Sequence, residues 1–487
     1  MRVIVAPNSR RVGPLRRACL AACVALSICG TPTPAGASGL LAPDEAGRYA
    51  VGFTTFPSTI GADLPTKITV WYPHCRAVYA GCSSAPPGTP TYPVTIFGGP
   101  NPQFTIPTAL GATPGVSVES GSFPLVLDLH GGPAGAPFRE RSRMRDFELM
   151  EHLASHGFVG AAYERNNAGQ CSNELAGPRD VISTLLARSR TAGDLLEGSI
   201  DPTRIGVTAT SAGGDAAYSL LTGADPSPQL PQGIAPDERV KALLATEAVH
   251  SGCGITPERK ASVTRPYLVM GGSPDRYDSN VVQPFREMVN ASPRILVQTI
   301  TKAEDANLNA EHLGFNVGDC DTTDTIREES LRLQQASGQN PLVEPLTSRF
   351  GSDPAILDSG ARVLAAEARR QWNNAINLFI RQKTMCNRVG TDPSGILPIG
   401  VPSPDGLVTS SPPFESSPFV PSNPAFTACS PVRCITGERM DRLTKLFATS
   451  FWKAYLKGDR RYNRFLTHGY SHQEPDAIVT RTGDEGA

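Results

Sequence analysis

The sequence predicts an α/β fold, in which helices cover both faces of a mostly parallel β-sheet. Short apolar segments alternate with amphipathic helical stretches from residue 124 onward, as in chains that build such sheets. Of the 487 residues, 40% are hydrophobic and 19% are charged, which is enough apolar material for a large core. Glycine (46) and proline (44) are abundant between the periodic segments and indicate long loops.

The periodic segments define the expected elements in chain order. Two half-buried strands come first, and a connection rich in Pro, Gly and Ser follows over residues 75–120. The strands are expected at 48–55, 66–72, 124–130, 158–163, 204–209, 240–245, 266–271 and 294–300, and the helices at 138–156, 179–195, 215–221, 281–289 and 440–457. Gly458 is suited to end the last helix.

The region between the last predicted strand and the last predicted helix is an expected insertion or lid. It holds a predicted helix over 356–385 and a Pro/Ser-rich loop over 391–430. The predicted organisation is a signal peptide (1–37), the α/β core (38–320), the insertion (321–435), the C-terminal helix of the core (436–475) and a tail (476–487).

The N-terminus has the pattern of an export signal. Basic residues around Arg16 precede an apolar stretch over 18–29, which is too short to span a bilayer, and Ala35-Gly36-Ala37 offers a cleavage site. We therefore expect a secreted or periplasmic protein with no stable membrane anchor. The net charge of −1 gives no reason to expect nucleic acid as a partner.

Cysteine usage fits the same compartment. Once the signal is removed, eight of the 11 cysteines are left, and an even number in an exported chain suggests disulfides. The expected pairs are Cys75–Cys82, Cys171–Cys253, Cys320–Cys386 and Cys429–Cys434. Clusters of Cys and His side chains at metal-ligand spacing are absent from the sequence, so no metal is expected, and no organic cofactor is implied.

The most informative motif surrounds Ser211. A β-branched, apolar segment over 205–208 leads into Ala209-Thr210-Ser211-Ala212-Gly213-Gly214, and a helical stretch follows. A strand that turns sharply into a helix with an exposed serine at the bend is a nucleophile elbow. The small residues on both sides are required because strand and helix pass very close together there.

A serine nucleophile needs a base and an acid to orient that base. Asp275 follows the predicted strand at 266–271, and His312 follows the last predicted strand, so Ser211, Asp275 and His312 occur in the order of this fold. Glu247, after the preceding strand, is the alternative acid, and Asp278 lies further along the loop of Asp275.

Other histidines compete less well as the base. His250 follows a strand, whereas His468 and His472 lie beyond the closing helix and are expected in the solvated tail. His152 and His156 lie four apart on a predicted helix but lack the glutamate of a zinc peptidase, so they are expected on a partly exposed helix face.

An oxyanion site is expected where the strand at 124–130 ends in His130-Gly131-Gly132-Pro133. Gly132 is the expected first backbone donor, because Pro133 has no N–H. The N–H of Ala212 is the expected second donor.

Residues 124–132, 151–162, 200–214 and 310–315 resemble the α/β-hydrolase superfamily. Within it they are similar to the exported dienelactone-hydrolase and platelet-activating-factor-acetylhydrolase-like branch, which includes cutinase-like polyester hydrolases. The resemblance implies triad roles for Ser211, Asp275 and His312 and oxyanion roles for Gly132 and Ala212. This sequence departs from the family pattern at Ala209, where glycine is usual, and in having the insertion at 321–435.

The expected activity is hydrolysis of a small or polymeric carboxylic ester through an acyl-enzyme. One alternative is a peptidase, because His130-Gly131-Gly132-Pro133 resembles the turn of proline iminopeptidases. The other alternative is a catalytically inactive binding module on the same fold.

Overall fold

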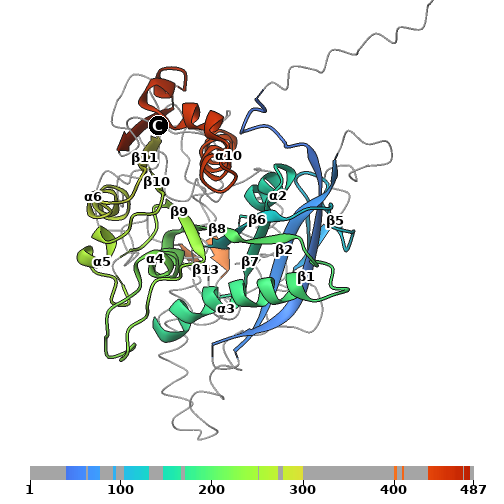
Figure 1. Ribbon diagram of the computed structural model, residues 1–487, viewed down its shortest axis with the longest axis horizontal. Coiled ribbons are helices and arrows are strands. Elements are labelled where there is room, and N and C mark those ends of the chain that lie inside the picture. Colours follow the sequence, from blue (N-terminus) through green and yellow to red (C-terminus); the bar gives the residue numbers. More distant parts are fainter. Residues whose placement is uncertain are drawn as a thin grey trace, which may run out of the picture. The chain divides into compact units, whose positions relative to one another are not determined.

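A ten-stranded mixed β-sheet organises the chain in a computed structural model (Figure 1). The structure describes residues 40–61, 64–76, 91–94, 104–130, 146–165, 171–250, 252–271, 278–299, 400–402, 408–410, 437–474 and 476–482. The chain divides into two units, Met1–Leu41 and Ala42–Ala487, and everything below concerns the second. The predicted signal peptide, the helix at 356–385, Gly132, Asp275 and His312 lie outside the described residues.

The strand order across the sheet is β14-β11-β10-β9-β8-β6-β7-β2-β1-β5. The strands are β1 (Tyr49–Ile60), β2 (Leu64–Arg76), β5 (Thr113–Pro114), β6 (Phe123–Leu129), β7 (Val159–Tyr163), β8 (Ile200–Thr210), β9 (Val240–Thr246), β10 (Tyr267–Gly271), β11 (Arg294–Thr299) and β14 (Ala477–Thr482). From β7 to β11 all neighbours run parallel, whereas β2 pairs antiparallel with both β1 and β7, and β14 pairs antiparallel with β11. The predicted α/β class is confirmed.

Two further pairs of short strands lie outside this sheet. β3 (Thr91–Val94) pairs with β4 (Phe104–Pro107), and both fall within the predicted connection at 75–120. β12 (Gly400–Pro402) pairs with β13 (Val408–Ser410) within the predicted Pro/Ser-rich loop.

The central strands form where the sequence has continuous apolar runs. Every residue of β6, β7 and β10 is buried, as expected of strands covered by helices on both faces. Even Asp128, the next-to-last residue of β6, is buried. β1 and β2 form a long antiparallel pair between β7 and the short edge strand β5, and β1 alternates more between buried and exposed residues than the central strands do.

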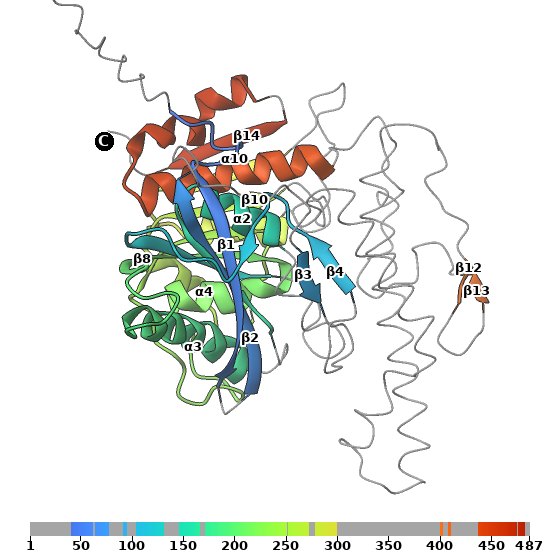
Figure 2. The ribbon, with the colours of Figure 1, turned by 90° about the vertical axis from the view of Figure 1, so that its right-hand side faces the viewer.

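Helices pack on both faces of the sheet (Figures 1 and 2). α2 (Phe147–Ser155) and α10 (Gly437–Tyr455) lie on one face, and α3 (Cys171–Arg190) and α4 (Gly214–Thr222) lie on the other. Glycines in the strands allow the close approach: a Cβ on Gly206 of β8 would lie 2.5 Å from the Trp452 ring of α10. The shorter elements are α5 (Pro257–Ala261), η2 (Asp278–Val282), α6 (Gln283–Glu287), η7 (Arg460–Leu466) and η8 (His468–His472). No helix within the described ranges is both long and apolar enough to cross a bilayer.

The predicted bounds of α3 and of the C-terminal tail were wrong, and β1 and β8 extend beyond their predicted ranges. α3 begins at Cys171 and runs through Pro178, because its first turns are held by the burial of Leu175 and by a disulfide at Cys171. The predicted tail at 476–487 is wrong for Ala477–Thr482, which form β14 and cover the edge of β11. Gly458, three residues after the end of α10, has a φ of 70°, a left-handed conformation that suits glycine.

The predicted Cys171–Cys253 disulfide is confirmed, with a Cα–Cα distance of 5.2 Å. It joins the first residue of α3 to the loop that follows β9. Cys75 is also disulfide-bonded. Its predicted partner, Cys82, lies outside the described residues, as do the four cysteines of the other two predicted pairs.

The expected exposed face at His152 and His156 was wrong, because both side chains are buried in α2. Their Nε2 atoms donate to the backbone carbonyls of Pro43 and Glu45, each at 2.8 Å, and so anchor the start of the folded unit. Burial lowers the pKa of His152 to about 3, helped by the positive charge of Lys445.

We expect this burial to make folding sensitive to acid. A histidine with a pKa lowered from 6.5 to about 3 is neutral in the fold but takes up a proton in the unfolded chain, so its stabilising contribution is lost as pH falls below 6.5. The advantage of the wild type over His152→Gln should therefore shrink by about 2 kcal/mol between pH 6.5 and 4.5 in urea unfolding. His472→Gln, at an exposed residue, is the control; an unchanged difference across pH would contradict the prediction.

Candidate active site

Ser211 occupies a sharp turn between β8 and α4. β8 ends at Thr210, the single turn Ser211–Gly213 follows, and α4 begins at Gly214. Ser211 has a φ of 52°, a strained left-handed conformation for a non-glycine residue, and its side chain is half-buried. The predicted strand–turn–helix is confirmed. A helix-covered parallel sheet with a serine in this turn is the α/β-hydrolase fold.

Two glycines make the turn possible. A Cβ on Gly213 would lie 1.7 Å from the carbonyl oxygen of Leu129, at the end of β6. A Cβ on Gly214 would lie 2.0 Å from the carbonyl oxygen of Val249, in the loop after β9. The turn is therefore held between two neighbouring backbone segments, and Val249 N–H also donates to the Ser211 carbonyl at 2.8 Å.

Glu247 lies on the same edge of the sheet, where the parallel strands β8 and β9 both end. Its side chain is fully buried and its φ is 44°. The Glu247 backbone N–H donates to the Met270 carbonyl at 3.0 Å, and the Glu247 backbone carbonyl accepts from Asn280 Nδ2 at 3.1 Å. A Cβ on Gly271 would lie 2.8 Å from its Cγ, so the Glu247 side chain lies against the end of β10.

The principal predicted acid and base are not among the described residues. Asp275 follows β10 and His312 follows β11 along the chain, so both come after strands that end at the edge of Ser211. Their triad roles stay predictions, as does the oxyanion role of Gly132. Asp278 is the first residue of η2.

His250 belongs to a hydrogen-bonded cluster with Lys260 and Glu287. Its Nδ1 accepts a hydrogen bond from the buried Lys260 ammonium at 2.6 Å, and Lys260 also donates to Glu287 Oε2 at 2.5 Å. The His250 ring packs near Tyr218, with centroids 5.8 Å apart. His468 and His472 lie on η8 and are exposed, and His468 Nδ1 donates to the Val479 carbonyl at 3.2 Å.

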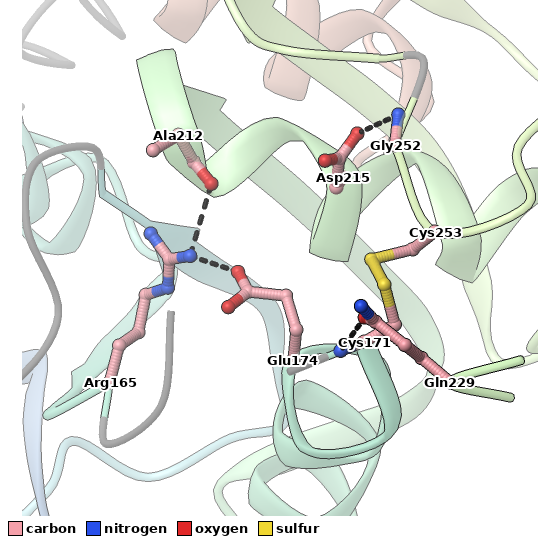
Figure 3. Close-up of a disulfide and its surroundings, with 8 residues drawn as sticks. All are labelled: Arg165, Cys171, Glu174, Ala212, Asp215, Gln229, Gly252 and Cys253. Carbon is pink, nitrogen blue, oxygen red and sulfur yellow. Dashed lines mark hydrogen bonds and ion pairs between the residues drawn. A yellow bond between two sulfur atoms is a disulfide. The ribbon is translucent and has the colours of Figure 1, made fainter. Parts of the chain in front are cut away.

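Arg165 was missed by the sequence analysis. It follows β7, is only 3% exposed, and donates to the carbonyls of His130 (2.8 Å) and Ala212 (3.0 Å). Its guanidinium also forms an ion pair with Glu174 of α3 (Figure 3). Burial raises the pKa of Glu174, and Arg165 partly offsets this. An arginine directly after a buried strand was the only sequence signal of this contact.

Asp215, in the first turn of α4, connects this helix to the loop after β9. Its Oδ1 accepts from Gly252 N–H at 3.0 Å, next to the Cys171–Cys253 disulfide (Figure 3). Burial raises its pKa. No group of His, Cys, Asp and Glu side chains within the described ranges could hold a metal ion.

Comparison with known proteins gives little beyond this geometry. No protein-family model matches the chain. No curated protein matches it either. A solved structure, a ferulic acid esterase from Streptomyces cinnamoneus, is similar to this chain with 15% sequence identity and a TM-score of 0.43, over 89% of this chain and 97% of that one. The assignment of the α/β-hydrolase fold rests on the strand order and on the turn at Ser211.

Proposed function

We propose that this chain is a serine hydrolase that cleaves carboxylic esters through an acyl-enzyme on Ser211. The observation that carries the proposal is the left-handed turn of Ser211, which lies half-buried between β8 and α4 at the carboxyl edge of the sheet. A left-handed backbone conformation costs free energy at a non-glycine residue. Such strained residues cluster at active sites and ligand-binding sites.

In the proposed reaction the Ser211 hydroxyl oxygen attacks the ester carbonyl, and His312 takes up the hydroxyl proton as it does so. The N–H groups of Gly132 and Ala212 stabilise the oxyanion, the alcohol leaves with the proton, and His312 then activates water to release the acid. Asp275 holds His312 in the required tautomer, with Glu247 as the alternative acid. No cofactor takes part in this scheme.

The substrate class and compartment belong to the proposal too. The sequence resemblance to the dienelactone-hydrolase and platelet-activating-factor-acetylhydrolase-like branch supports a small or polymeric ester as substrate. Export to the secreted or periplasmic space is supported by the N-terminal signal pattern and by the Cys171–Cys253 disulfide.

The test is a comparison of p-nitrophenyl butyrate with Pro-p-nitroanilide as substrates of the purified chain, together with labelling by a fluorophosphonate. We expect ester hydrolysis, one phosphonyl group per chain, and an adduct that maps to Ser211. Preferential cleavage of the anilide would favour the peptidase. A folded chain that cleaves neither compound and takes up no label would favour the inactive binding module.

A further inference from the structure

One buried side chain contacts both the end of β6 and the Ser211 turn, which bears the proposed oxyanion donor Ala212. Arg165 Nη1 donates to the carbonyl of His130, where β6 has just ended, and Nη2 donates to the carbonyl of Ala212 in the Ser211 turn. These two carbonyls come from residues far apart in the sequence, and the guanidinium lies between them (Figure 3 shows the Ala212 side of this contact). The fork of a guanidinium is rigid, so two such bonds fix the relative placement of the segments.

The bond to Ala212 lies close along the chain to a proposed donor. The Ala212 carbonyl is separated from the Ala212 N–H by a single Cα. The bond from Arg165 to this carbonyl therefore limits the rotation of the peptide next to the donor, and the bond to His130 ties the turn to the end of β6.

Arg165 is itself held by an ion pair, through the same nitrogen that bonds to Ala212. Glu174 of α3 pairs with Nη2, and the first residue of α3 is tied by the Cys171–Cys253 disulfide to the loop after β9 (Figure 3). That same loop contacts Ser211 through Val249 and Asp215 through Gly252. The Arg165–Glu174 ion pair is thus linked, through α3 and the disulfide, to the loop after β9 that contacts the Ser211 turn.

We propose that Arg165 is a positioning residue that sets the geometry of the Ala212 backbone donor of the oxyanion site, by holding the Ser211 turn against the end of β6. This inference rests on the proposed function. The competing explanation is that Arg165 merely satisfies buried carbonyls, as Arg265 does: its guanidinium donates to the carbonyls of Asp237, Val240 and Leu221 at 2.6–2.8 Å, away from the Ser211 turn. Only a positioning role affects the transition state more than the bound substrate.

The test compares Arg165→Met/Glu174→Met with Arg165→Lys and with the matched control Arg265→Met. The double variant removes both charges of the buried pair, because removal of one alone would leave the other uncompensated. Arg165→Lys keeps the charge opposite Glu174 but loses the fork. For each protein, kcat and KM are measured with p-nitrophenyl butyrate, together with inhibition by a trifluoromethyl ketone, whose serine adduct carries an oxyanion.

We expect kcat to fall about 100-fold in both Arg165 variants, with KM within about threefold of the wild-type value and ketone inhibition weakened by a factor similar to that in kcat. Arg265→Met should lower the unfolding midpoint and leave kcat within about twofold. If the double variant does not fold, Arg165→Lys decides by the same criteria.

Two results separate this inference from the proposed function. A wild type that is active and labelled by the fluorophosphonate, with folded Arg165 variants that keep wild-type kcat and ketone inhibition, would overturn the positioning role alone. An equal loss of kcat in Arg265→Met would overturn it as well. A folded wild type that forms no adduct and cleaves no ester would overturn the proposed function and this role with it.

Discussion

Replacing Ser211 with alanine is expected to lower kcat for p-nitrophenyl butyrate by roughly 10⁶-fold and to abolish fluorophosphonate labelling. The hydroxyl forms the acyl bond in the proposed reaction, so nothing else in the chain can substitute for it. Residual hydrolysis above the rate in water is expected, because the oxyanion donors still act on the substrate. The measurement is steady-state hydrolysis with protein purified free of other esterases.

The stability of Ser211→Ala separates chemistry from folding. Ser211 is half-buried and keeps its left-handed φ with either side chain, so the unfolding midpoint should change little. Ser120→Ala, at an exposed serine before β6, should leave kcat unchanged. A Ser211→Ala protein that retains more than a few per cent of wild-type activity would show that the nucleophile lies elsewhere.

The central sheet was predictable because its signal is local. Tyr-Leu-Val-Met-Gly in β10 and, apart from Asp128, Pro-Leu-Val-Leu-Asp-Leu in β6 are continuous apolar runs of the length expected of strands buried on both faces. The turn at Ser211 was predictable for the same reason: glycines at 213 and 214 are what the close approach of Leu129 and Val249 demands.

The contacts that depend on distant parts of the chain were not predictable. Arg165 bonds to His130 and Ala212, and nothing in the residues around it encodes those partners. His152 is buried because the segment at Pro43 folds over it, although its helix has a polar sequence at that position. In the same way, β14 forms because the edge of β11 is available to pair with it.

The second large effect concerns the acid, and it distinguishes Asp275 from Glu247. We expect Asp275→Asn to lower kcat by about 10⁴-fold, because the amide holds the catalytic imidazole in the wrong tautomer. Its unfolding midpoint should change by only a few degrees. The measurement is kcat for p-nitrophenyl butyrate together with thermal unfolding of the same preparations.

Glu247→Gln should give the opposite pattern. Its side chain is fully buried against the end of β10, so a change in hydrogen bonding there should lower the unfolding midpoint, whereas kcat should fall by less than about tenfold. The two substitutions are matched in size and each serves as the control for the other. If Glu247→Gln costs about 10⁴-fold in kcat and Asp275→Asn does not, the acid follows β9 instead of β10. Glu247, in its left-handed conformation beside the strand of Ser211, would then be the residue that orients the base.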